Sequence, residues 1–119
     1  MGNRDETARW HTQAAQQQLA DAERRGLSSH TRLTCAHNAV IHAGIVLLLR
    51  RALVPPSESW EQCSYDAVVT ACGDDACAWL RTWYANRYDP DAAFAISSDD
   101  VDTAVKAARS VARTVFDRD

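Results

Sequence analysis

The sequence predicts an all-α protein, an antiparallel bundle of four to five helices that forms a single domain over residues 1–119. Apolar residues recur at three- and four-residue intervals through most of the chain, as they do in helices that bury one face. No segment alternates apolar and polar residues as a half-buried strand would. The composition, 46% hydrophobic and 24% charged, is typical of a folded globular domain.

The first predicted helix covers residues 5–25, where Trp10, Leu19 and several alanines form a narrow apolar stripe on a polar, glutamine-rich segment. Gly26 follows this stripe, and a glycine at such a place commonly adopts the left-handed conformation that ends a helix. We therefore expect Gly26 to terminate the first helix.

The second predicted helix, residues 28–53, begins at a pair of serines that can cap its N-terminus. It is apolar over a wide surface, so we expect it to lie near the centre of the bundle. Its small residues Ala39, Ala43 and Gly44 should let a neighbouring helix approach closely.

A third helix is predicted up to Cys72, and Gly73 then interrupts the helical pattern. The sequence leaves two interpretations of Gly73 open, a kink in one long helix or a true end followed by a fourth helix over residues 76–87. The candidate N-caps are Ser57 or Ser59 for the third helix and Asp74 or Asp75 for the fourth.

The last predicted helix starts near Ser98 and has the clearest pattern in the chain, with valines and alanines repeating at three and four residues up to Phe116. Aspartates at its start suit the positive end of the helix dipole. Residues 88–97, which contain Asp-Pro-Asp, are predicted to be a loop.

Charge and composition exclude some broad functions. A net charge of −3 argues against a general nucleic-acid or acidic-membrane binder, although it leaves room for a local basic patch. The longest apolar run, residues 43–49, is short for a bilayer, and the N-terminus has no apolar leader-like region. We therefore expect a cytoplasmic protein without membrane association, in which the thiols are reduced. These thiols belong to Cys35, Cys63, Cys72 and Cys77.

No metal or cofactor is predicted. His30 and His37 are seven residues apart and share a helix face, as do Cys35 and His42. Seven residues separate two side chains by about 10 Å along the helix, which is too far for two ligands of one ion. A glycine-rich loop that could cradle phosphates is also missing from the sequence.

The end of the fourth predicted helix holds the candidate binding residues, Arg81, Asn86, Arg87 and Tyr88. Arginine can clamp a phosphate, while asparagine and tyrosine can hydrogen-bond a base or a ribose. The structural alternative is that the aromatic residues here belong to the core and that the arginines are solvated or paired with nearby aspartates. Both interpretations remain open at the level of the sequence.

Two stretches of the chain resemble the HEPN superfamily of small helical-bundle proteins. One is SHTRLTCAHNAVIHA at residues 29–43, which is similar to the long second helix of that family. The other runs from Leu80 through Tyr88-Asp89-Pro90 to the helix at residues 101–116, and looks like the family's arginine motif, loop and last helix. The resemblance implies a homodimer and a toxin–antitoxin or other defence context.

Active HEPN proteins cleave RNA without metal through an R-x4–6-H motif, which in some members is R-x4-H-x-Y. Arg81, Asn86 and Tyr88 match the second pattern except that asparagine replaces histidine. Asparagine cannot exchange a proton near pH 7, and no histidine follows His42. We therefore expect that standard ribonuclease activity is lost, and no catalytic residue is assigned.

A literal R-x4-H match also occurs at Arg32 and His37, in the second predicted helix. Asn38 and Ala39 follow it, so the tyrosine of the longer motif is missing there. We interpret this match as chance.

Three functional hypotheses follow. The first is a HEPN-like protein that binds RNA, a nucleotide or a partner protein through residues 81–88. The second is an adaptor or inhibitor that docks on a protein and binds no nucleic acid. The third is a residual ribonuclease that uses Tyr84 or Tyr88 with Arg81, although a tyrosine pKa of about 10 makes a poor base.

Overall fold

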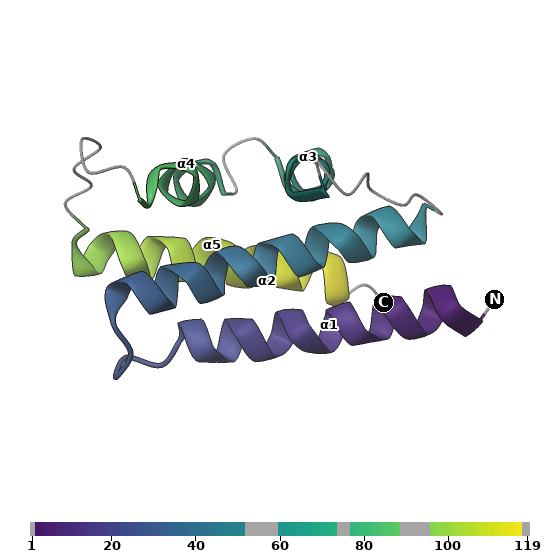
Figure 1. Ribbon diagram of the computed structural model, residues 1–119, viewed down its shortest axis with the longest axis horizontal. Helices are drawn as coiled ribbons and strands as arrows, with labels where there is room; N and C mark the ends of the chain where they lie inside the picture. Colours follow the sequence, from purple (N-terminus) through teal and green to yellow (C-terminus); the bar gives the residue numbers. More distant parts are fainter. Residues whose placement is uncertain (1, 52–59, 74–76, 89–95, 118–119) are drawn as a thin grey trace.

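Five α-helices make up the part of the chain that the computed structural model describes, namely residues 2–51, 60–73, 77–88 and 96–117 (Figure 1). They are α1 (Gly2–Ala22), α2 (Ser29–Arg50), α3 (Trp60–Cys72), α4 (Ala78–Asn86) and α5 (Ser98–Phe116). These ranges contain no β-strand. The predicted all-α bundle is confirmed.

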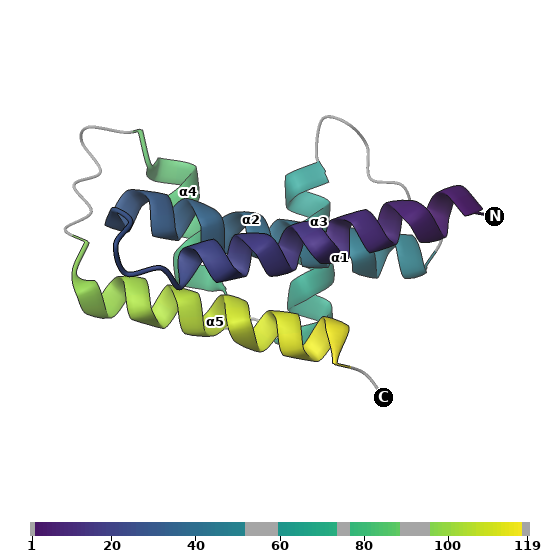
Figure 2. The same ribbon diagram turned by 90° about the horizontal axis from the view of Figure 1, so that it is seen from below.

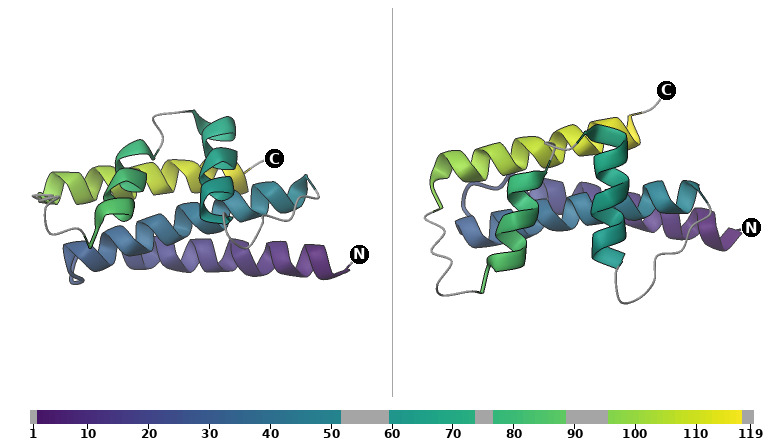
Figure 3. Two further views of the ribbon diagram at one scale, coloured as in Figure 1. Left: turned by 45° about the horizontal axis from the view of Figure 1, so that its top comes forward. Right: turned by 90° about the horizontal axis from the view of Figure 1, so that it is seen from above.

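The three long helices α1, α2 and α5 lie side by side, and the short helices α3 and α4 cross over α2 and α5 on the side away from α1 (Figures 1 and 3). Helix α2 runs antiparallel to α1 and in the same direction as α5 (Figure 2). It contacts all four other helices, so its predicted central position is confirmed.

The core forms where the apolar faces of the helices meet on α2. Twelve residues of α2 are buried, among them Leu33, Val40 and Val46. Helix α5 contributes the valines and alanines of its predicted stripe, and α4 contributes Leu80 and Trp83. By length and composition alone α2 could cross a membrane, but 72% of its apolar window is buried in the bundle, as a central core helix requires.

The crossing of α2 and α3 depends on a close backbone approach at Gly44. A Cβ atom at this position would overlap the backbone of Ser64 in α3. Ser64 is fully buried, and its hydroxyl donates a hydrogen bond of 2.7 Å to the carbonyl of Trp60. The expected close approach at the small residues of α2 is therefore confirmed, and it brings α3 directly onto α2.

Serine caps fix the starts of two long helices. The Ser28 hydroxyl accepts a hydrogen bond from the backbone N–H of Thr31 at the start of α2. Ser97 and Asp100 form a reciprocal capping box at the start of α5, where the expected N-terminus is confirmed. The expectation for Gly26 is wrong, because α1 ends at Ala22 and the backbone of Gly26 is not left-handed.

The left-handed glycine of the described chain is Gly73, with φ 101°. It follows the last residue of α3, so it marks a true helix end rather than a kink. Helix α4 starts with Cys77 as its N-cap, and the Cys77 side chain makes no capping bond. The candidate caps Asp74 and Asp75 lie outside the described residues. Ser57, Ser59 and residues 89–95 of the predicted loop lie outside the described residues.

Candidate functional site

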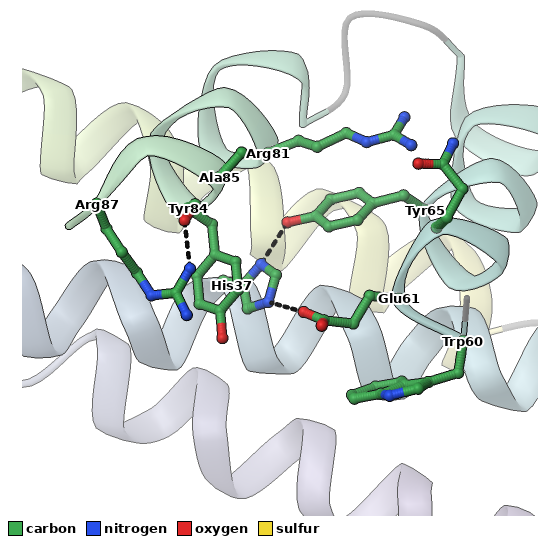
Figure 4. A pocket seen from close by; sticks show the side chains of 9 residues that line it. His37, Trp60, Glu61, Tyr65, Arg81, Tyr84, Ala85 and Arg87 are labelled. Atoms are coloured by element: carbon green, nitrogen blue, oxygen red, sulfur yellow. Dashed lines mark hydrogen bonds and ion pairs between the residues drawn. The ribbon is translucent and has the colours of Figure 1, made fainter. Parts of the chain in front are cut away.

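A cavity of about 420 Å³ opens between α2, α3 and α4 (Figure 4). Helix α2 supplies its floor, α3 one wall, and α4 with its C-cap the other. The lining residues are His37, Trp60, Glu61, Gln62, Tyr65, Arg81, Tyr84, Ala85 and Arg87. Such a volume suits a small-molecule ligand the size of a nucleotide.

His37 is the centre of the polar contacts at the floor. Its Nδ1 lies 2.6 Å from the Tyr65 hydroxyl, and its Nε2 lies 3.4 Å from Oε2 of Glu61. A carboxylate only accepts hydrogen bonds, so Nε2 carries the proton and Nδ1 accepts the proton of Tyr65. The imidazole therefore connects α2 to two residues of α3.

Burial holds His37 in its neutral form. Its side chain is 1% exposed, and burial, with a smaller contribution from the positive charge of Arg87, lowers its pKa from 6.5 to about 3. These two effects outweigh the nearby Glu61 carboxylate, which favours the charged ring. Burial also raises the pKa of Tyr65. Neither group exchanges protons near neutral pH, so both act as fixed hydrogen-bonding groups.

Arg87 and His37 lie on the two sides of the Tyr84 ring (Figure 4). The ring centroids of His37 and Tyr84 are 3.3 Å apart and nearly parallel. The Arg87 guanidinium carbon lies 3.5 Å from the Tyr84 ring centroid, and its Nη1 donates to the Tyr84 carbonyl. This stack fixes the Arg87 guanidinium at the edge of the cavity.

Arg81 reaches the cavity from the middle of α4. Its guanidinium carbon lies 5.1 Å from the Tyr65 ring centroid, and Nη2 is 3.7 Å from Oδ1 of Asp66. The arginine–aspartate pairing of the structural alternative is thus present at Arg81. Asp66 is 60% exposed, however, and an ion pair in contact with water contributes little stability and leaves the arginine available to a stronger anion.

The structure brings together two of the four predicted site residues. Arg81 and Arg87 both line the cavity, whereas Asn86 and Tyr88 do not. Asn86 turns back along its own helix, and its Nδ2 donates to the Thr82 carbonyl at 2.9 Å. Tyr88 is 78% exposed, and its ring lies near the guanidinium group of Arg87 and the ring of His30.

The histidine faces predicted from the spacing are confirmed. His30 and His37 both turn toward α4, where His30 contacts Trp83 and His37 contacts Tyr84. His42 instead faces α1, with its Nδ1 2.8 Å from Nδ1 of His11. The described ranges contain no group of three or more His, Cys, Asp or Glu side chains that could hold a metal ion.

Arg32 and His37, the residues of the literal R-x4-H match, lie on different sides of α2. Arg32 is buried on the other side of α2, where its Nε donates to the Ala22 carbonyl at 2.8 Å and its Nη2 lies 3.9 Å from Asp102. The imidazole of His37 faces the cavity instead.

The wall formed by α3 was not predicted as part of a site. Trp60, Glu61 and Tyr65 carry no motif, and they reach the cavity because α3 crosses α2 at Gly44. Trp60 is 40% exposed, so it presents an accessible aromatic surface, while both faces of Tyr84 are covered.

Comparison of the chain with protein-family models, curated proteins and solved structures finds no match. HEPN membership therefore stays a prediction from the sequence.

Proposed function

We propose that this HEPN-like helical protein binds RNA or a nucleotide in the α2–α3–α4 cavity and lacks standard ribonuclease activity. The observation that carries the proposal is that Arg81 and Arg87 line one cavity together with the accessible ring of Trp60. Guanidinium groups suit bidentate contacts with phosphate, and aromatic rings stack on bases.

The charges of the cavity favour a phosphate near α4. Arg81 and Arg87 enter the lining from α4, and Glu61 enters it from α3. The Arg87 guanidinium stays against Tyr84 of α4, whereas the Arg81 guanidinium reaches across to Tyr65 and Asp66 of α3. The Tyr84 carbonyl takes one N–H of Arg87, and a guanidinium has five N–H donors, so donors remain for a ligand. A phosphate bound there would displace Asp66 from Arg81 at little cost, because the ion pair is in contact with water and contributes little stability.

Two features support the absence of standard cleavage chemistry. Asn86 stands where the R-x4-H-x-Y motif has its histidine and has no proton to exchange near neutral pH. The histidine that does line the cavity, His37, is buried, uses both ring nitrogens and has a pKa of about 3. A group with that pKa is a weak base at pH 7.

Incubation of the protein with a labelled structured RNA in the absence of metal tests the proposal, with binding and cleavage read in one experiment. We expect binding without cleavage, and loss of binding in Arg81→Ala. Arg113→Ala is the matched control, because Arg113 is an exposed arginine of α5 that does not line the cavity. Equal affinity of Arg81→Ala and wild type at fixed salt would contradict the proposed contact between Arg81 and a phosphate of the RNA.

A homodimer and a toxin–antitoxin or defence context complete the proposal, and both come from the HEPN resemblance. Sedimentation over a wide range of protein concentrations tests the dimer. A constant monomer mass would refute it.

Exposed aromatic residues favour a second candidate function, a protein-interaction module without nucleic-acid binding. Trp10 on α1 is 60% exposed and Tyr88 is 78% exposed. Large aromatic side chains at such positions are common anchors of protein interfaces. Capture of a specific protein partner, combined with no RNA binding at low salt, would favour this candidate over the first.

A further inference from the structure

Glu61 lies in the cavity in a position that a phosphate-binding site does not require. A carboxylate repels phosphate, so its place among two arginines calls for a different role. Its Oε2 is 3.4 Å from Nε2 of His37, and its side chain is 45% exposed. Glu61 is therefore anchored by one oxygen and remains open to the cavity.

The residues around His37 fix the orientation of this anchor. His37 is held by the Tyr65 hydroxyl at 2.6 Å and by the parallel ring of Tyr84. A neutral ring with its proton on Nε2 presents one donor, and that donor faces Glu61. His37, Tyr65 and Tyr84 thus fix the orientation of the Glu61 carboxylate, as expected for a group that binds a ligand selectively.

A carboxylate distinguishes the four RNA bases by their hydrogen-bonding edges. The Watson–Crick edge of guanine presents two adjacent N–H donors, N1–H and the N2 amino group, which match the two carboxylate oxygens. Adenine and cytosine place a ring-nitrogen acceptor beside their amino group, and uracil flanks its N–H with two carbonyl oxygens. Those acceptors repel a carboxylate, so guanine is the base that pairs with both oxygens.

We infer that the cavity is selective for guanine, with Glu61 accepting hydrogen bonds from the Watson–Crick edge of the base, Trp60 available for stacking and the two arginines at the phosphate. The inference rests on the proposed RNA or nucleotide binding and specifies its ligand. The N–H donors of the guanine base then meet a carboxylate, and the phosphate meets arginine, in one cavity of about 420 Å³.

Octauridylate RNAs with one central guanosine, inosine or adenosine test the inference by direct binding measurements at fixed low salt. Inosine lacks only the N2 amino group, so it removes one of the two donors. We expect the guanosine RNA to bind about tenfold more tightly than the adenosine RNA, with inosine between them. Free GMP, IMP and AMP form a second arm. The same order among free nucleotides assigns the site to a mononucleotide, and the order in RNA alone assigns it to a strand.

Glu61→Gln should reduce the guanosine preference to less than about twofold, because an amide offers one acceptor and places a donor against the base. Glu6→Gln, at an exposed position on α1, is the matched loss of one charge and should keep the preference. Equal binding of the three RNAs and of the three nucleotides would overturn the guanine inference and leave the proposed function standing. No binding of any of the six probes would overturn both.

Discussion

The imidazole of His37 lies parallel to the phenol ring of Tyr84, with ring centroids 3.3 Å apart. The contact joins the central helix α2 to α4, and on the other face of Tyr84 it continues to Arg87. This stack of His37, Tyr84 and Arg87 holds the C-terminal end of α4 at a fixed place above the cavity floor on α2. The polar floor and the cationic wall are thus one packed unit.

Folding stability should depend on pH through His37. Its pKa is about 3 in the folded protein against 6.5 for the free side chain, so between these values the unfolded chain binds a proton that the folded chain does not. The free energy of unfolding should therefore fall as the pH falls below 6.5, by up to about 1.4 kcal/mol per pH unit from this residue.

Urea unfolding of the wild type and of His37→Gln between pH 7.5 and pH 4.5 measures this contribution. Glutamine keeps one donor and one acceptor but does not titrate, so its stability should decline less steeply with acid. His11 and His42, whose pKa values burial also lowers, are present in both proteins and cancel. Identical pH slopes would contradict the buried neutral His37.

Gly44→Ala should destabilise the fold by about 2 kcal/mol, because its Cβ would overlap the Ser64 backbone and force α3 away from α2. Gly26→Ala is the control. Nothing lies within 4 Å of a Cβ at Gly26, so its free energy of unfolding should change by less than about 0.5 kcal/mol. Thermal or urea unfolding compares them, and equal stabilities would show that the α2–α3 approach is looser than described.

Trp60→Ala should weaken RNA binding about tenfold, because Trp60 offers the accessible ring of the cavity and the loss of one base stack costs roughly 1–3 kcal/mol. Trp10→Ala removes an equally large exposed ring from α1, outside the cavity lining, and should leave affinity unchanged. Weaker binding by Trp10→Ala, with unchanged binding by Trp60→Ala, would indicate that the RNA binds at α1 instead of the cavity.

Asn86→His restores the sequence pattern R-x4-H-x-Y but should not restore RNA cleavage. The side chain at position 86 turns toward the Thr82 carbonyl and does not line the cavity that holds Arg81. An imidazole there would stand outside that cavity. Metal-free cleavage that appears with Asn86→His and disappears when Arg81→Ala is added would contradict this placement.

Periodicity was enough to predict the helices, because each apolar stripe is a local property. The apolar stripe of α5 predicted a helix that starts near Ser98, and the wide apolar surface of α2 predicted its central position. Helix ends were predicted less well. Gly26 and Gly73 offer the same chemistry in the sequence, and the left-handed backbone occurs at Gly73.

Only the part of the candidate site that comes from one local segment could be predicted from the sequence. Arg81 and Arg87 belong to one short segment, so local reasoning could select them together. Glu61 and His37 are 24 residues apart and meet only because α3 crosses α2 at Gly44. The sequence pattern carries no signal of that crossing angle, and so the carboxylate and the imidazole of the cavity could not be assigned in advance.

The salt dependence of RNA binding tests most directly whether Arg81 and Arg87 contact phosphates. Each phosphate contact on a single strand contributes roughly 0.7 to the slope of log affinity against log salt. Arg81→Ala/Arg87→Ala should therefore lower that slope by roughly 1.4 and weaken binding at every salt concentration, while Arg113→Ala leaves both unchanged. An unaltered slope and affinity in the double variant would contradict the account.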